Sequence, residues 1–282
     1  MQLYVSTSGH KENAISHAHK LAEMGFKRLE LSGGTYCPNL ITDLKLLKQN
    51  TVNLLLHNYF PPPTQPFVMN LASDNRRIRE ESLDLAMEAI DISSKIGSPY
   101  YGVHAGFLFD PEIKDLGNIV SRKELIDREV ALERFVQNID YLAKFAYKKN
   151  VKLLVENNVL SQANLESFGV NPFLLVEPDE ILRFFESVGN NVGLLLDLGH
   201  LNVSAQSLNL QNSECLAKLS KFVSGYHFSD NDGTQDQHLE LSASTWFLPY
   251  IDSKAMFGTL EIHSQDATQI ANSLAILEGI IG

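Results

Sequence analysis

Several features are scarce in this sequence, and each absence excludes a class of protein. The 282 residues include only two cysteines, Cys37 and Cys215, which lie far apart. We therefore expect no disulfide framework and no thiolate zinc site, and the composition suits a reducing cytoplasm. No apolar run reaches the ~18 residues that span a bilayer, and residues 1–10 lack the basic start and long apolar core of a signal peptide. The sequence predicts a cytoplasmic protein with no membrane partner.

Basic residues are also in the minority. Lysine and arginine number 23 against 34 aspartates and glutamates, which gives a net charge of −11. Nucleic-acid binding relies on basic side chains that neutralise phosphates, so this balance disfavours a nucleic-acid partner, although an acidic protein can carry a local basic rim. The first expected strand–helix turn lacks the Gly-x-Gly-x-x-Gly pattern, which disfavours a bound nicotinamide cofactor. Nothing in the sequence indicates an oligomeric state.

What the sequence does contain is an alternation, repeated eight times, of short apolar segments and segments with helical periodicity. Strands are expected at residues 2–6, 27–31, 51–57, 100–104, 151–156, 192–197, 223–228 and 257–262. Helices are expected at 11–24, 40–49, 73–96 with Ser73 as the cap, about 121–149, 178–188, 203–221 (irregular), 243–252 and 266–280. Strands that are apolar on both faces are typical of a parallel sheet covered by helices. The pattern predicts an α/β fold, a single (β/α)8 TIM barrel over residues 1–282, with a doubly wound open sheet as the alternative.

Almost every expected strand ends in a side chain that can bind a metal. These side chains are Glu30, His57, His104, Glu156, Asp197, His227 and Glu261. One histidine after an apolar run is more often structural, but seven such ends in register are hard to obtain by chance. In a barrel they would meet at one mouth, where unpaired buried charges are costly and clustered carboxylates repel one another. One or more divalent cations would resolve that repulsion.

The stretch 225–239, GYHFSDNDGTQDQHL, adds two further candidates. On an extended segment, Asp236 and His238 would point the same way and could clamp a metal together, although the stretch also fits a polar turn. Glu156, Asp197, His227 and Glu261 would form a four-ligand site. The side chains that could extend it to two or three ions are His57, His104, His200, Asp236 and His238. Oxygen and imidazole ligands without thiolate suit zinc, manganese, magnesium or cobalt.

Some neighbouring side chains have weaker assignments. Glu30 could support a ligand or bind substrate rather than the metal, and Asn157 and Asn158 could orient Glu156. An apolar wall beside the site could come from Tyr59, Phe60, Phe107 and Trp246, or these could simply be packing residues. Substrate choice is expected to depend on the loops at 58–73, 105–120 and 157–176.

These motifs resemble those of the xylose-isomerase-like barrels, a superfamily of sugar isomerases, ketose 3-epimerases, inosose dehydratases and the endonuclease IV family. The resemblance covers essentially the whole chain. It rests on LLVENN around Glu156, LLLDLGH around Asp197 and His200, YHFSDNDG around His227, and TLEIH around Glu261.

The epimerase-like members imply one metal held by the four ligands named above. Glu156 and Glu261 would also be the catalytic acid and base on opposite faces of a sugar, and His200 would bind a substrate oxygen. The endonuclease IV members imply a cluster of three zinc ions. Its ligands match His57, His104, Glu156, Asp197, His200, His227, Asp236, His238 and Glu261.

Three functional hypotheses follow. The first is a metal-dependent isomerase or epimerase of a sugar, sugar phosphate or cyclitol that proceeds through a metal-stabilised enediolate. The alternative is an endonuclease IV-like zinc phosphodiesterase, although Leu239-Glu240-Leu241-Ser242 stands where that family usually has a Gly-Glu-Gly turn. The third is a barrel that only binds a ligand, which the two glutamates argue against.

Overall fold

The structure, a computed structural model that describes residues 1–9 and 12–282, is a closed barrel of parallel strands in the order β1 to β8. The strands are β1 (Gln2–Ser6), β2 (Arg28–Ser32), β3 (Asn53–His57), β4 (Tyr100–His104), β5 (Lys152–Glu156), β6 (Val192–Asp197), β7 (Val223–Phe228) and β8 (Phe257–Leu260). β1 pairs with β8 as well as with β2, so the ends of the chain meet and close the sheet. The predicted (β/α)8 barrel is therefore confirmed, and the open sheet is excluded.

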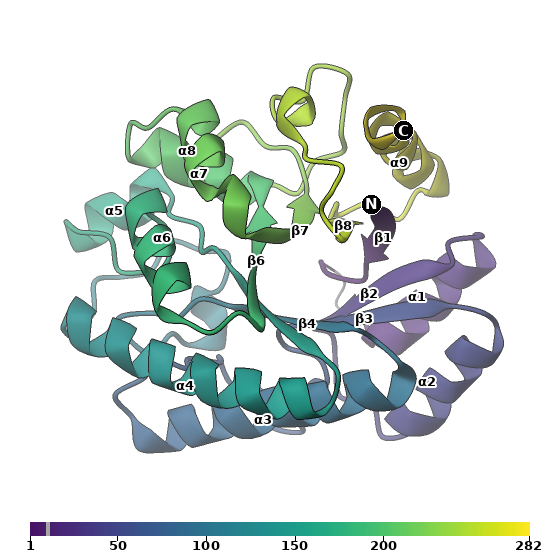
Figure 1. The fold of residues 1–282 in the computed structure, drawn as a ribbon, viewed down its shortest axis with the longest axis horizontal. Helices are drawn as coiled ribbons and strands as arrows, with labels where there is room; N and C mark the ends of the chain where they lie inside the picture. Colours follow the sequence, from purple (N-terminus) through teal and green to yellow (C-terminus); the bar gives the residue numbers. More distant parts are fainter. Residues whose placement is uncertain (10–11) are drawn as a thin grey trace.

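Helices surround the strands, and Figure 1 shows α3 and α4 lying along one side of the barrel. The helices are α1 (Ala14–Glu23), α2 (Leu40–Gln49), α3 (Arg76–Ile96), α4 (Arg128–Lys148), α5 (Gln162–Phe168), α6 (Pro178–Ser187), α7 (Leu198–Ser207), α8 (Asn212–Leu219) and α9 (Ala267–Ile281). Short 3-10 turns occupy Ile113–Asp115, Ser220–Phe222 and Leu248–Tyr250. No helix in the described ranges is long and apolar enough to cross a membrane.

Apolar side chains on both faces of the strands explain why this sheet is covered. Leu29, Leu54 and Val155 are buried in the layer between strands and helices, while Leu55, Leu154 and Leu195 belong to a separate buried cluster. Strands that bury both faces must have helices outside and a filled interior, which is the arrangement of a (β/α)8 barrel. The polar strand ends therefore collect at one rim.

The largest differences from the sequence-based expectations lie in the loops and at helix starts. The helix expected from Ser73 begins at Arg76, because Asn75 accepts the hydrogen bond from the backbone N–H of Arg77, and Ser73 instead donates to Asp110. The helix expected from about 121 begins at Arg128 with Asp127 as its cap. Residue 11, the first of the helix expected at 11–24, lies outside the described residues.

Two other regions differ in kind. The helix expected at 243–252 is reduced to the 3-10 turn Leu248–Tyr250, whereas the segment 157–176, expected as a loop, contains α5. The irregular helical region expected from 203 starts earlier, since α7 begins at Leu198 immediately after β6. This early start matters for function, because it places His200 in the first turn of a helix.

Candidate metal centre and active site

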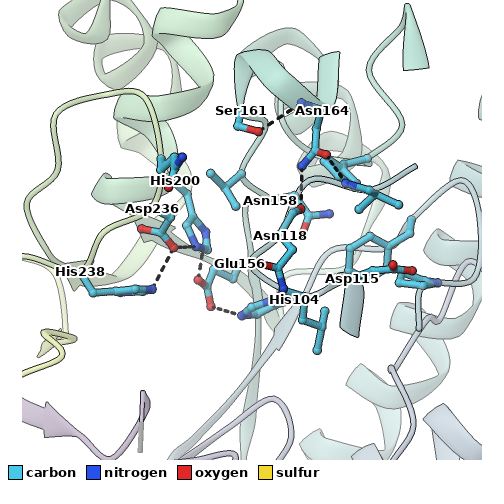
Figure 2. A pocket seen from close by; sticks show the side chains of 18 of the residues that line it. His104, Asp115, Asn118, Glu156, Asn158, Ser161, Asn164, His200, Asp236 and His238 are labelled. Carbon is cyan, nitrogen blue, oxygen red and sulfur yellow. Dashed lines mark hydrogen bonds and ion pairs between the residues drawn. The ribbon is translucent and has the colours of Figure 1, made fainter. Parts of the chain in front are cut away.

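A cavity of about 860 Å³ opens at the rim where the carboxyl ends of the strands meet. His57, His104 and Glu156, the last residues of β3, β4 and β5, line its floor together with Glu261. Figure 2 shows His238, Asp236 and His200 on one side of it and Asp115 on the other. This is the face on which barrels of this kind carry their chemistry.

Glu156, Asp197, His227 and Glu261 form a quartet at the base of the cavity. One ligand atom from each lies within 4.8 Å of the other three, and all four side chains are buried. From Nδ1 of His227 the distances are 2.8 Å to Glu261 Oε2, 3.6 Å to Glu156 Oε1 and 3.8 Å to Asp197 Oδ2. Strand pairing sets up part of this geometry, because Asp197 and His227 are direct partners across β6 and β7.

The quartet contains polar atoms that are buried without a well-aligned hydrogen bond. Among the described residues these include Glu156 Oε1, Asp197 Oδ2 and His227 Nδ1. Leaving such atoms unpaired costs several kcal/mol in total, at about 1–3 kcal/mol each and more for charged groups. Carboxylate oxygen and imidazole nitrogen atoms are common ligands of zinc and manganese. Together with a carboxylate oxygen of Glu261, these three atoms could coordinate such an ion as four ligands. The residues present therefore fit a divalent cation.

The protonation of the quartet shows the same need for positive charge. Burial by itself would raise the pKa of Glu156, but the nearby charges of His104, His227 and His57 hold it well below its usual range. Burial would lower the pKa of His227, yet the surrounding carboxylates raise it well above its usual value. Burial raises the pKa of Asp197 to about 6. The carboxylates and imidazoles are therefore electrostatically coupled, and a bound cation would take over the role of the imidazole protons as the positive charge beside the carboxylates.

His57 and His104 form a second group that shares Glu156 with the quartet. Oε2 of Glu156 lies 2.6 Å from His57 Nε2 and 3.3 Å from His104 Nε2. The two imidazole rings lie 5.1 Å apart between centroids. The ligand atoms of all three residues lie within 4.8 Å of one another, so this group could hold a second cation.

Asp236 lies between His200 and His238 and forms a third group. Its Oδ2 atom is 3.1 Å from Nε2 of His200 and 3.0 Å from Nε2 of His238. In both histidines Nδ1 lies within hydrogen-bond distance of a backbone carbonyl, of Asn157 at 2.8 Å and of Glu261 at 3.1 Å. Nε2 of each ring is therefore directed at Asp236 and the cavity. The extended conformation expected for this pair is wrong, because the φ angle of His238 is 49°.

Asn157 positions Asp197 and His200, not Glu156 as the sequence suggested. Its side-chain oxygen accepts a hydrogen bond from the backbone N–H of Asp197 at 2.8 Å, and its amide nitrogen donates to the Asp197 carbonyl at 3.1 Å. Asp197 in turn accepts from the backbone N–H of His200 at 2.6 Å and so caps α7. Asn158 ties together two loop carbonyls, those of Gly106 and Leu174.

Glu30 lies below the rim rather than at a strand end, because β2 continues to Ser32. It is 2% exposed. Its Oε1 atom is 2.9 Å from Nε2 of His227, and its Oε2 atom accepts a hydrogen bond from the Thr259 hydroxyl at 2.9 Å. Glu30 supports His227 from the side remote from the quartet. This is the supporting contact expected for a metal-bound histidine.

The apolar wall of the cavity is only partly the one expected. Tyr59 and Phe107 line the cavity, but Phe60 is buried in the core, and Trp246 packs edge-on against Phe247 away from the site. Sequence reasoning missed several lining residues in the segment 109–120, namely Phe109, Leu116, Ile119 and Val120. Apolar residues inside an otherwise polar loop are the signal that could have revealed them.

The fold and the rim define a (β/α)8 barrel with buried imidazole and carboxylate groups that fit a divalent cation. The model of the xylose isomerase-like TIM barrel family matches residues 18–266, and the chain belongs to this family.

Sequence comparison finds curated relatives at modest identity. The fructoselysine 3-epimerase of Shigella flexneri is 27% identical over 222 residues, which cover 68% of this chain and 74% of that protein. An uncharacterised protein of Methanocaldococcus jannaschii is 26% identical over 237 residues, which cover 82% of this chain and 70% of that protein.

Solved structures share the fold over the full length. A D-tagatose 3-epimerase-like protein superposes with a TM-score of 0.73 at 21% identity, with all of both chains covered. The D-psicose 3-epimerase of Clostridium cellulolyticum superposes with a TM-score of 0.69 at 15% identity, over 100% of this chain and 99% of that one. At these identities the likeness is one of fold.

Proposed function

We propose that this protein is a divalent-metal-dependent isomerase or epimerase of a sugar or sugar-like substrate. The observation that carries the proposal is the convergence of Glu156 Oε1, Asp197 Oδ2 and His227 Nδ1, buried and without well-aligned hydrogen bonds, at the base of the cavity. A single domain over residues 1–282 is part of the proposal, supported by the pairing of β1 with β8.

Glu156, Asp197, His227 and Glu261 are the side chains that would hold the cation. Zinc, manganese, magnesium and cobalt all suit this donor set. When bound, the cation supplies Lewis-acid polarisation of a carbonyl and the adjacent hydroxyl, which makes the C–H bond between them acidic and offsets the charge of the enediolate.

The two glutamates are the proposed proton carriers. One carboxylate removes the proton from the carbon next to the carbonyl, and the electron pair of that C–H bond moves into the enediolate. Return of a proton from the same carboxyl to the neighbouring carbon gives an isomer, while delivery from the second carboxyl to the opposite face gives an epimer. Such acid–base help contributes about 10²–10⁴-fold to the rate.

His200 is the proposed ligand for a substrate oxygen. Its orientation is fixed by the α7 turn that starts at Asp197 and by the Asn157 carbonyl 2.8 Å from Nδ1. Nε2 lies 3.1 Å from Asp236, whose carboxylate favours the protonated ring. The charges of Asp197 and Asp236 raise the pKa of His200 well above its usual value, although burial acts in the opposite direction. Nε2 is the ring nitrogen that faces the cavity, so a substrate hydroxyl or carbonyl oxygen would share or replace its contact with Asp236.

The relatives support epimerisation next to a carbonyl as the reaction type. The curated relative from Shigella flexneri is a fructoselysine 3-epimerase, and the structural neighbours include a D-psicose 3-epimerase. Both names describe inversion at a carbon adjacent to the ketose carbonyl. The same enediolate chemistry accounts for isomerisation, so the proton-transfer roles of Glu156 and Glu261 are common to both reactions.

An endonuclease IV-like phosphodiesterase is the second candidate. The group of His57, His104 and Glu156 favours it, since this group could hold a second cation beside the quartet. The cavity lining opposes it, because none of the described residues that line it is a lysine or arginine. Binding of a nucleic-acid backbone depends on such side chains.

The proposal is tested by proton exchange. Purified protein supplied with manganese and then with zinc is incubated with D-fructose in deuterated water, and the product is followed by NMR. We expect deuterium at the carbon next to the carbonyl together with formation of the epimer or isomer. Glu156→Gln should lower turnover about 10²–10⁴-fold, whereas the surface control Glu80→Gln, which pairs with Arg76, should not. Full activity in Glu156→Gln would refute the assignment of Glu156.

A further inference from the structure

The cavity has an outer, apolar part that the proposed proton transfer does not use. We call it the apolar annex and define it as Phe107, Phe109, Leu116, Ile119 and Val120. The whole cavity, at about 860 Å³, lies near the top of the range of ~300–1,000 Å³ that holds drug-sized ligands. A free hexose has only about twelve non-hydrogen atoms, so it leaves much of this space to another part of the ligand.

The inner wall of the annex is a rigid aromatic cluster. Phe107 packs edge-on against Phe173 with ring centroids 5.8 Å apart, and Phe109 stacks on Phe168 at 5.3 Å. Both annex phenylalanines are buried in one apolar cluster together with Val120. Aromatic rings fixed on several sides form a preformed apolar surface for a ring or chain of a ligand.

The outer wall is apolar and exposed. Leu116 is 39% exposed and Ile119 is 65% exposed, although both line the cavity. Large apolar side chains in water at the opening of a cavity gain free energy when a ligand covers them. Because they line the same cavity as the buried phenylalanines, they point to an occupant with an apolar surface.

Two polar side chains at this end, Asp115 and Asn164, already make hydrogen bonds within the protein. The carboxylate of Asp115 accepts from Lys123 at 2.6 Å and from the backbone N–H of Glu112 at 2.8 Å. Asn164 accepts from the backbone N–H of Val120 at 2.8 Å and donates to the Asn118 carbonyl at 3.4 Å. These contacts connect the loop to the α5 helix, and Asp115 Oδ2 and both polar atoms of the Asn164 amide already have partners within the protein.

A phosphate is also disfavoured as the occupant. Within the described ranges, residues 1–9 and 12–282, no lysine or arginine lines the cavity. Lys123 lies nearby, but its ammonium group pairs with Asp115 and lies 5.4 Å from the centroid of the Phe109 ring. A dianionic group in this annex would have no cationic side chain free to bind it.

We propose that the natural substrate is an unphosphorylated sugar that carries an uncharged apolar substituent, with the sugar at the metal quartet and the substituent in the apolar annex. This inference rests on the proposed function for the sugar end. Its own content is the chemistry of the other end, an alkyl or aryl group rather than a phosphate or a zwitterionic amino acid.

The test compares ketoses that share one core. The probes are D-fructose, its 1-anilino-1-deoxy and 6-O-benzyl derivatives, its 6-phosphate, and fructoselysine. We expect at least one of the two aryl ketoses to show a kcat/KM about ten-fold or more above that of D-fructose, since burial of one ring contributes at least that much in affinity. The phosphate and the lysine derivative should show no such gain. Equal kcat/KM for D-fructose and both aryl ketoses, or a preference for either charged probe, would overturn the proposal.

Loop variants locate the effect in the annex. Ile119→Ser and Leu116→Ser should raise KM for the preferred aryl ketose about ten-fold and lower the ratio of kcat/KM for that ketose to kcat/KM for D-fructose by about the same factor. The matched control is Ile113→Ser, because Ile113 is 54% exposed and lies in the same loop but does not line the cavity. An Ile113→Ser effect equal to that of Ile119→Ser would contradict a specific annex.

A binding measurement separates this inference from the proposed function. Calorimetric titration of the protein as purified with each ketose reports affinity without turnover. Tighter binding of an aryl ketose with no turnover of any ketose would refute the proposed reaction and support the role of the annex. Turnover of D-fructose with no gain in binding or kcat/KM for either aryl ketose would support the reaction and refute the role of the annex.

Discussion

The carboxylate of Glu30 lies 2.9 Å from Nε2 of His227, although the two residues are almost two hundred positions apart in the sequence. Glu30 therefore lies beside one ring nitrogen of His227, and the other ring nitrogen faces the quartet. With Nε2 turned to Glu30, Nδ1 is the atom that lies 2.8 Å from Glu261. Thr259, on β8, holds the other oxygen of Glu30 at 2.9 Å.

We expect Glu30→Gln to weaken metal binding without unfolding the barrel. A glutamine keeps the shape but removes the negative charge that orients His227 and raises its basicity. Loss of such a support typically lowers metal affinity about 10–100-fold. Isothermal titration with zinc and manganese measures the change. The exposed Glu112→Gln is the control, and an unchanged affinity in Glu30→Gln would show that the contact only fills space.

Removal of the metal should destabilise the protein. A cation that binds only the folded chain contributes about 2.7 kcal/mol when its free concentration is one hundred times its dissociation constant. For a chain of this size that corresponds to a fall in Tm of about 5 °C after chelation. Differential scanning calorimetry measures the fall, and added metal should restore the original Tm. A Tm that is identical before and after chelation, in protein shown by mass spectrometry to have lost metal, would count against the quartet as a cation site.

Asp236→Asn separates the one-metal proposal from the multinuclear alternative. In the proposed isomerase or epimerase, Asp236 positions His200 and His238 from 3.1 Å and 3.0 Å. The variant should therefore keep the metal content of the wild type and raise KM several-fold, because the Nε2 atom of His200 loses its anionic partner. Metal content is measured by plasma mass spectrometry. Loss of a metal equivalent per chain would instead favour the phosphodiesterase.

Gly102→Ala tests how closely the floor of the site is packed. A methyl group at Gly102 would lie 2.9 Å from Cδ2 of His57 and 3.0 Å from Cδ2 of Leu195. We expect a loss of about 1–3 kcal/mol in the free energy of unfolding, as for other overpacked cores, and weaker metal binding because His57 must move away from Glu156. Urea denaturation measures the first effect. Gly189→Ala is the control, since no atom lies within 4 Å of its added methyl group.

The architecture was predictable because each strand is marked by its own residues. Short runs such as LLLH at 54–57 and LLLD at 194–197 are apolar on both faces and end in a polar side chain. Such runs require a sheet covered on both faces, and eight of them in alternation with helices indicate a (β/α)8 barrel. The helix starts were less predictable, since Ser73 and Asn75 are both good caps and the choice between them depends on Asp110, which is distant in the sequence.

The candidate site could be predicted as a set of residues but not as an arrangement. The sequence singled out Glu156, Asp197, His227 and Glu261 because they lie at or beside strand ends, and the structure brings them together. It could not reveal that Glu30 lies two residues before the end of β2, because the end of a strand depends on its pairing with the neighbouring strand.

The aromatic wall was only partly predictable, since Tyr59 and Phe107 line the cavity and Phe60 and Trp246 do not. Whether Phe60 or Trp246 faces the cavity depends on the path of a loop, and no periodicity in the sequence records that path. Leu116 and Ile119 carried a weak signal, since apolar side chains in a polar connection rarely lack a reason to be there.

The four residues of the quartet, which are the proposed metal ligands, lie at or beside strand ends. The annex residues lie on the connection between β4 and α4. Replacement of that connection would alter which molecules are accepted and leave the reactive centre as it is. The substrate specificity of the proposed enzyme could therefore change through replacement of the β4–α4 connection alone, without a change in the residues of the quartet.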